Sequence, residues 1–188
     1  RKQVKKYPLK YAFNYLKSVS KPTAYQKDQD FYFYGLQSEE EFLALLEQND
    51  TLFVMGFSYC HKPFECPSGR FSDQCQHEDK HPVCSQCFIG KCIHSVPDGR
   101  AIPLSIPTVH YIGNQILSLA HANPNKKIVF LITACEMTLH MFADWGNMMD
   151  IKGIGVRLDG RICNTMKAFD LSEKGIKPGL TVVTTPTQ

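Results

Sequence analysis

The chain has 188 residues, which suits one domain, and its composition is 43% hydrophobic and 21% charged. A globular protein of this composition builds its own core and does not need disulfides for stability. The net charge of +3 is modest, and a nucleic-acid partner is not expected. No apolar run approaches the roughly 20 residues that span a bilayer, and no secretory signal core follows the basic start. We therefore expect a cytoplasmic protein without a transmembrane segment, in which thiols stay reduced.

The N-terminal segment is basic and aromatic, and its first ten residues hold five of the 21 basic side chains. The spacing of its apolar residues predicts one helical face that ends before Lys21-Pro22. That face comprises Tyr11, Phe13, Leu16 and Val19. Basic amphipathic helices bind membranes or nucleic acids in some proteins, but packing on the rest of the chain is the simpler expectation. We predict a basic arm over 1–30 and a single α/β domain over 31–188.

Helical and strand patterns alternate along the domain. Helical patterns cover 38–48, 108–122 and 135–147, and the first of these opens on a serine cap followed by acidic residues. Short apolar runs predict strands over 51–57, 128–134, 151–158 and 180–185. This alternation predicts a doubly wound, mostly parallel, Rossmann-like sheet. Residues 60–97 interrupt it as a cysteine-rich insertion with no clear period.

Three thiols lie close together in the stretch C-S-Q-C-F-I-G-K-C, at Cys84, Cys87 and Cys92. A C-x2-C turn aims two thiolates at one metal, and zinc and iron–sulfur sites both use it. Gly90 supplies backbone freedom that lets Cys92 fold back as a third ligand. An upstream thiol completes the set, and we predict Cys75, Cys84, Cys87 and Cys92 as metal ligands.

Three alternatives to a metal site made only of cysteines stay open. Zinc with His81, Cys84, Cys87 and Cys92 has suitable ligand types, although structural zinc more often uses two separated pairs of ligands. Disulfides are a second alternative, disfavoured by a reducing compartment. Unliganded buried thiols are the third.

Three further thiols follow predicted strands: Cys60 after 51–57, Cys135 after 128–134, and Cys163 five residues after 151–158. Ligands of open α/β sheets collect outside the carboxyl ends of the strands. If the three strands are neighbours, these thiols converge on one pocket although they lie far apart in the sequence.

The C-terminal half carries a set of short motifs: Ala134-Cys135-Glu136, Gly155-Val156, Asp159-Gly160, Cys163 and Asn164-Thr165. In these motifs the chain resembles the bacterial and archaeal domain-of-unknown-function family numbered one hundred and sixteen, over roughly 51–175. That family also has an upstream C-x2-C-x2-C cluster, to which Cys84, Cys87 and Cys92 would correspond with one longer spacing. The resemblance implies an iron–sulfur or metal-binding protein and no particular reaction.

Phosphate-loop, dinucleotide-binding, hydrolase-elbow and zinc-protease motifs are absent from the sequence. We therefore expect an iron–sulfur protein with one or two clusters of the 4Fe–4S type, acting in redox or sulfur-handling chemistry with an electron-transfer or enzyme partner. All eight cysteines are candidate cluster ligands: Cys60, Cys66, Cys75, Cys84, Cys87, Cys92, Cys135 and Cys163. A zinc-stapled binding module, whose basic arm contacts a partner or nucleic acid, is the alternative, and a metal-free thiol enzyme is a third.

Overall fold

The computed structural model describes residues 8–20, 24–159, 163, 165–177 and 179–184. Its strands are β1 (Gln26–Asp28), β2 (Phe31–Tyr34), β3 (Thr51–Ser58), β4 (Ala101–Ile106), β5 (Lys127–Ala134), β6 (Lys152–Asp159) and β7 (Val182–Val183). Its helices are α1 (Pro8–Val19), α2 (Glu39–Leu46), α3 (Pro82–Gln86), α4 (Phe88–His94), α5 (Val109–Ala122), α6 (Glu136–Met149) and α7 (Met166–Ser172), with a 3₁₀ turn η2 (Tyr59–His61).

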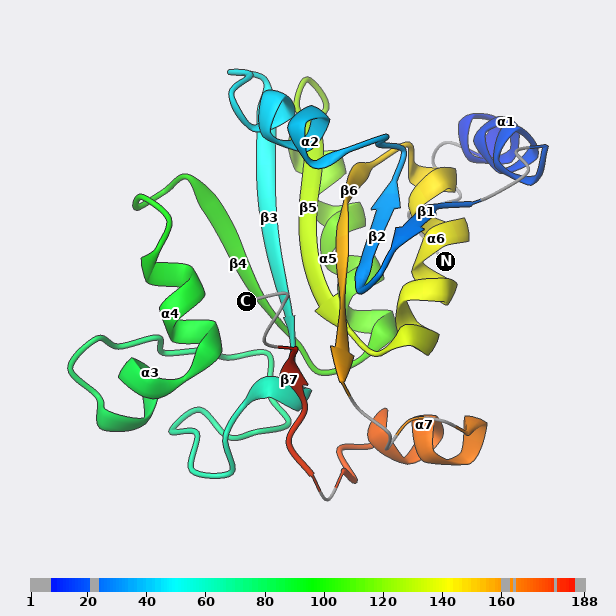
Figure 1. The fold of residues 1–188 in the computed structure, drawn as a ribbon. Helices are drawn as coiled ribbons and strands as arrows, with labels where there is room; N and C mark the ends of the chain where they lie inside the picture. The colour runs from blue at the N-terminus through cyan, green and yellow to red at the C-terminus, as the bar shows by residue number, and fades with distance from the viewer. Residues whose placement is uncertain (1–7, 21–23, 160–162, 164, 178, 185–188) are drawn as a thin grey trace.

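The described strands form a mixed, mostly parallel sheet in the order β1-β2-β6-β5-β3-β4, with β7 paired to β6 (Figure 1). β3, β4, β5 and β6 run parallel, while β1, β2 and β7 pair antiparallel. The predicted mixed α/β fold with a mostly parallel sheet is confirmed. The finer doubly wound, Rossmann-like assignment stays a prediction.

The predicted helices and strands occur close to their expected places. Ser38 and Thr108 cap α2 and α5, because each hydroxyl accepts a backbone N–H three residues on, at 3.4 and 3.1 Å. Of the predicted strand 180–185, Val182–Val183 forms β7. Lys21-Pro22, Gly160, Asn164 and the basic residues 1–7 lie outside the described residues.

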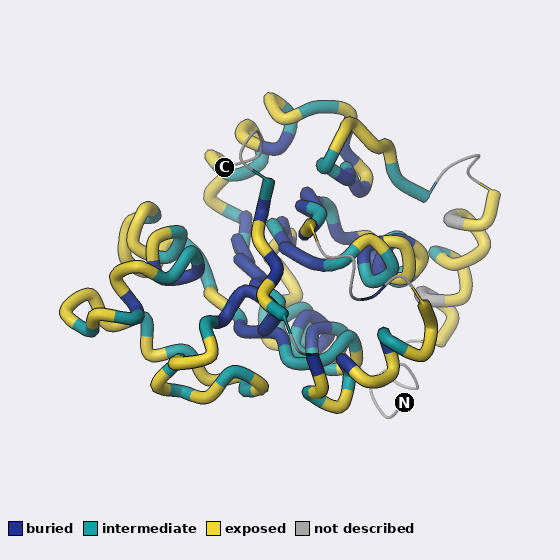
Figure 2. Tube along the Cα trace, turned by 60° about the horizontal axis from the view of Figure 1, so that its bottom comes forward, coloured by how far each residue is buried: buried dark blue, intermediate teal, exposed yellow. Residues whose placement is uncertain are grey.

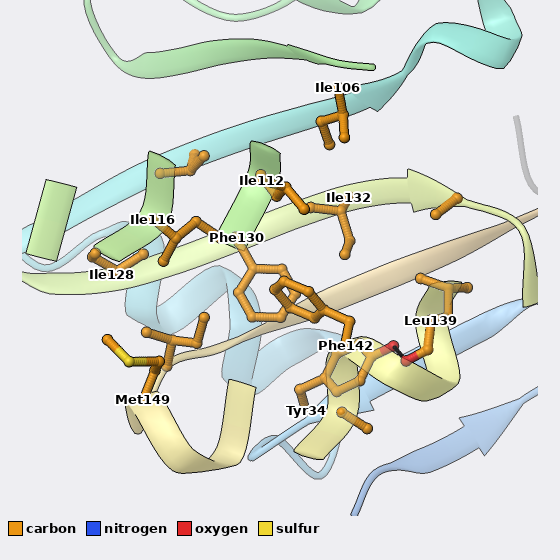
Figure 3. Close-up of a cluster of buried hydrophobic side chains, with 14 of the residues drawn as sticks. Tyr34, Ile106, Ile112, Ile116, Ile128, Phe130, Ile132, Leu139, Phe142 and Met149 are labelled. Atoms are coloured by element: carbon orange, nitrogen blue, oxygen red, sulfur yellow. Dashed lines mark hydrogen bonds between the residues drawn. The ribbon is translucent and has the colours of Figure 1, made fainter. Parts of the chain in front are cut away.

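Side-chain alternation along the central strands divides the core into two clusters. On one face, α5 and α6 pack over β5 through Ile116, Phe130 and Phe142 (Figure 3). On the other face, the insertion and α2 cover Phe53, Phe57 and other side chains. Figure 2 shows the buried segments running through the centre of the molecule between exposed loops. The sheet therefore has apolar packing on both faces, and it positions the residues that follow its strands.

The N-terminal segment contains a helix, as predicted, and then an edge strand. α1 lies beside α6, where the Asn14 side-chain amide donates to the Met148 carbonyl at 3.1 Å. Phe13, Leu16 and Val19 of the predicted apolar face are nevertheless exposed. None of the helices in the described ranges combines the length and the apolar character that a membrane crossing needs.

The packing of β6 predicts a test of the fold. A Cβ added at Gly153 would overlap the carbonyl oxygen of Phe130 and come within 2.6 Å of its ring. We expect Gly153→Ala to lower the free energy of unfolding by about 1–3 kcal/mol, the usual cost of overpacking. Gly113→Ala is the control, since its Cβ meets Trp145 at an ordinary 3.7 Å and alanine favours helices by about 0.8–1 kcal/mol. Urea denaturation measures both, and equal effects would contradict this packing.

Candidate thiol site at the strand ends

The carboxyl ends of β3, β5 and β6 meet at one edge of the sheet, because these strands are parallel neighbours. Figure 1 shows the cysteine-rich insertion and α7 at the end toward which these three strands point. Cys60 lies in η2 directly after β3, Cys135 follows β5 as the N-cap of α6, and Cys163 follows β6. All three line one cavity of about 30 Å³. The expected convergence of the three thiols is confirmed, and we call them the strand-end group.

Lys177 is the cation that contacts the thiols of this site, and Glu173 also lines the cavity. Its side chain is 5% exposed, and its Nζ donates to Cys60 Sγ at 2.9 Å and to Cys163 Sγ at 3.7 Å. The Arg70 guanidinium fixes the backbone around it by donating to the carbonyls of Lys177, at 2.7 Å, and Gly179. A buried ammonium is costly unless it is paired. The contacts with sulfur therefore favour a thiolate beside Lys177.

The pKa of the Cys163 thiol is lowered to about 5. Its hydrogen bond with Cys135 contributes most, followed by contacts with Ser172 and Lys177, while burial acts in the opposite direction. The pKa of Cys135 is raised, because its S–H donates to the Cys163 sulfur and because it is partly buried. Thr138 Oγ1 lies 3.2 Å from Cys135 Sγ. The arrangement is a thiolate on Cys163 held by a protonated Cys135.

Sequence reasoning found the three thiols but missed the residues that control them. Lys177 lies in a loop with glycine and proline, where a lysine normally indicates a solvated surface. Ser172 closes α7, which is short and was not predicted. Tyr59 connects the turn after β3 to α7, because its hydroxyl donates to the Ser172 carbonyl at 2.6 Å. Only the folded path of the C-terminal segment brings these groups to the thiols.

Four further cysteines surround a second, smaller cavity of about 10 Å³ inside the insertion. They are Cys66, Cys75, Cys84 and Cys87, which we call the insertion group. Lys62 lines the same cavity and is 1% exposed. Its Nζ donates to the carbonyls of Gly69, Ser72 and Gln74 at 3.3, 2.8 and 2.5 Å. The Lys62 ammonium thus ties the loop around the insertion group.

Cys92 and His81 lie differently from the sequence expectation. Cys92 is on α4 and does not line the insertion cavity, and its pKa is raised to about 11, first by burial and then by Cys87. His81 Nδ1 accepts the backbone N–H of Val83 at 3.2 Å and so caps α3. The structure therefore groups Cys66 rather than Cys92 with Cys75, Cys84 and Cys87.

In the part of the chain that the structure describes, no group of three or more His, Cys, Asp or Glu side chains is placed so that it could hold a metal ion. All eight cysteines are free thiols. The predicted ligand set of Cys75, Cys84, Cys87 and Cys92 stays a prediction, as do the iron–sulfur cluster and the zinc alternative.

Comparisons with protein-family models, with curated proteins and with solved structures found no match. The resemblance in the C-terminal half therefore stays a prediction. What the sites can do follows from the chain's own residues.

Lys177 gives the first prediction for the site. Lys177→Met should raise the pKa of Cys163, since it removes the ammonium beside the thiolate. A higher pKa lowers the thiolate fraction of Cys163 at pH 6, which is close to its pKa in the parent protein. Ultraviolet thiolate absorbance against pH measures this, with Cys163→Ser to identify the signal. The exposed Lys174→Met, which removes a charge paired with Asp170, is the control. An unchanged titration in Lys177→Met would contradict the role of Lys177.

Proposed function

We propose that the strand-end group is a thiol redox site in which Cys163 reacts and Cys135 resolves. The observation that carries the proposal is that the Cys163 sulfur lies 3.7 Å from the buried Lys177 ammonium and shares one small cavity with the Cys135 thiol. The thiolate is the nucleophilic form of cysteine, and cationic neighbours favour it near neutral pH. The carboxyl edge of a parallel sheet is also the usual location of sites in α/β folds.

The size of the cavity favours a small oxidant. About 30 Å³ is space for about one or two water-sized molecules. Hydrogen peroxide is only slightly larger than water, whereas a disulfide substrate needs much more room. Cys163 is buried and Cys135 is partly exposed, so a large substrate cannot reach the thiolate without movement of the surrounding loops. We therefore propose a peroxide as the oxidant.

The chemistry balances with the two thiols and one peroxide. The Cys163 thiolate attacks one peroxide oxygen, the O–O bond breaks, and the leaving hydroxide becomes water by taking up the proton that Cys163 gave to the solvent when it ionised. Cys163 is then a sulfenic acid, and the Cys135 sulfur attacks it as its proton leaves with the departing hydroxyl as water. The products are a Cys135–Cys163 disulfide and water, and the two thiols have supplied both electrons. A cellular dithiol, the expected reductant in a reducing compartment, returns the pair to its starting state.

Peroxide treatment of the protein tests this proposal. Parent protein should lose the mass of two hydrogen atoms, and peptide mapping should locate a disulfide between Cys135 and Cys163. Cys163→Ser should abolish that disulfide, because the thiolate is missing. Cys135→Ser should stop at the sulfenic acid on Cys163, which a dimedone probe labels. Cys92→Ser, outside both cysteine groups, should behave like the parent. A parent protein that forms no Cys135–Cys163 linkage under peroxide would reject the assignment.

A second candidate function is metal binding by the insertion group, and the observation that favours it is the shared cavity of Cys66, Cys75, Cys84 and Cys87. Four cysteines are the ligand set of both 4Fe–4S clusters and structural zinc. The positive charge of Lys62, which acts on Cys66, Cys75 and Cys87, would offset part of the negative charge of such thiolates. The four cysteines fit either metal centre in number and type, but their sulfur atoms would have to move closer together to coordinate it.

The identity of the metal decides what this second site does. An iron–sulfur cluster would supply one-electron transfer and would make the chain a redox protein with an electron-transfer partner. Zinc would only staple the insertion, whose helices α3 and α4 are short. In both cases Lys62 would hold the loop backbone in place through its three carbonyl contacts.

Metal analysis of anaerobically purified protein tests the second candidate. Brown protein with stoichiometric iron and sulfide would support a cluster, and colourless protein with zinc would support a staple. We expect Cys66→Ser and Cys84→Ser to lose the metal and Cys92→Ser to keep it, because Cys92 does not line the cavity. If Cys92→Ser lost the metal and Cys66→Ser kept it, the result would instead support the ligand set predicted from the sequence. Metal-free protein with all thiols titratable would exclude metal binding.

A further inference from the structure

The helix α1 exposes apolar side chains to the solvent. Figure 1 shows this helix at the outer edge of the molecule, where it contacts α6. Leu9, Phe13 and Leu16 recur at spacings of four and three residues, so they share one side of the helix, and Val19 follows one turn later. We call these four residues the outer face; their side chains are between 65% and 85% exposed. A contiguous exposed apolar face marks a surface that binds a partner.

A different side of α1 holds the helix to the protein. Asn14 lies there, and its side-chain amide donates to the Met148 carbonyl near the end of α6 at 3.1 Å. Ala24, which follows α1 in the chain, is fixed in the same way, because its carbonyl accepts the Asn147 side-chain amide at 2.8 Å. The outer face is therefore already exposed while α1 is attached to α6, and nothing has to be uncovered before it binds.

Positive charge is concentrated in the same part of the sequence. Residues 1–22 contain seven of the 21 Lys and Arg side chains and none of the 18 Asp and Glu side chains. The rest of the chain therefore has 14 basic and 18 acidic side chains. Within α1, Lys17 is exposed and follows Phe13 by about one helical turn, at the edge of the outer face. A negatively charged surface is thus attracted to this part of the chain and not to the remainder.

Three kinds of partner differ in how well they match apolar side chains beside positive charge. Nucleic acid bases stack on aromatic rings, whereas three of the four side chains of the outer face are aliphatic. A second copy of the chain would bring like charges together, and each partner of a standard protein interface contributes about 20–30 residues, many more than this face offers. Anionic phospholipids match both features, because their head groups are negative and their acyl chains accept apolar side chains.

We propose that α1 binds the surface of membranes that contain anionic phospholipids. The helix lies in the plane of the head groups, with Leu9, Phe13 and Leu16 inserted at the boundary of the acyl chains and Lys17 directed toward the lipid phosphates. Its 12 residues form only about three turns, which suits a helix that lies on a bilayer of about 30 Å and does not cross it. The proposal rests on neither the redox site nor the metal site.

Vesicle co-sedimentation of the full chain tests the proposal. We expect vesicles of roughly three parts phosphatidylcholine to one part phosphatidylserine to bind at least about tenfold more tightly than pure phosphatidylcholine, because each basic side chain near an anionic surface contributes on the order of fivefold. Added salt should weaken the binding, since it screens the charges. Phe13→Ser and Leu16→Ser should each weaken it about tenfold, because the bilayer no longer buries that apolar side chain.

Leu43→Ser is the matched control. Leu43 is also an exposed apolar residue of a helix, but α2 begins with three acidic residues. We expect this variant to bind vesicles like the parent. The Phe13, Leu16 and Leu43 variants should all unfold at nearly the parent's urea concentration, since the side chains that they change are exposed.

Several results would overturn the proposal. Equal binding to both kinds of vesicle would remove the role of charge, and equal effects of Phe13→Ser and Leu43→Ser would remove the role of the outer face. A dimer in sedimentation equilibrium that Phe13→Ser separates would assign the face to a second copy of the chain. A single-stranded RNA oligonucleotide that binds through Phe13, in a chain that ignores the vesicles, would assign it to nucleic acid.

Discussion

The parallel register of β6, β5 and β3 is the constraint on which the candidate site depends. Parallel neighbours end at the same edge, so residues that follow them are gathered there whatever their separation in the sequence. Cys60 and Cys163 are separated by about a hundred residues, yet both contact the Lys177 ammonium. An antiparallel β5 would have sent Cys135 to the opposite end of the sheet. The glycines of β6 serve the same register, because Gly153 lets the Phe130 backbone and ring approach closely.

Two buried lysines organise the two cysteine groups, in different ways. Lys62 donates to three carbonyls of its own loop, so its charge is solvated by backbone oxygen atoms. Lys177 instead donates to sulfur, and a neutral thiol is a weak acceptor. The cost of burying Lys177 is therefore recovered only when a neighbouring sulfur is negative. For this reason a reactive thiolate is proposed at the strand ends, whereas the insertion group is treated as a set of ligands.

The elements with strong local signals could be predicted from the sequence, and those fixed by tertiary contacts could not. Apolar runs indicated β3 and β5, a serine cap marked α2, and a helical pattern indicated α5. β2 was missed because its aromatic run is only four residues long, and β4 because it begins in a proline-containing stretch beside the insertion. The convergence of Cys60, Cys135 and Cys163 followed from topology. The grouping of Cys66 with Cys84 depends on how Lys62 folds the loop, and no spacing rule contains that information.

The turn after β3 supplies neighbouring residues to both cysteine groups. A 3₁₀ turn has about three residues per turn, so successive side chains point in directions about a third of a circle apart. Cys60 accordingly contacts Lys177, His61 stacks on Phe88, and Lys62 binds the insertion carbonyls. Because these three residues are consecutive, a shift of the backbone at one of them moves the other two. The Lys177 contact at the strand ends and the Lys62 contacts in the insertion therefore depend on the same short segment.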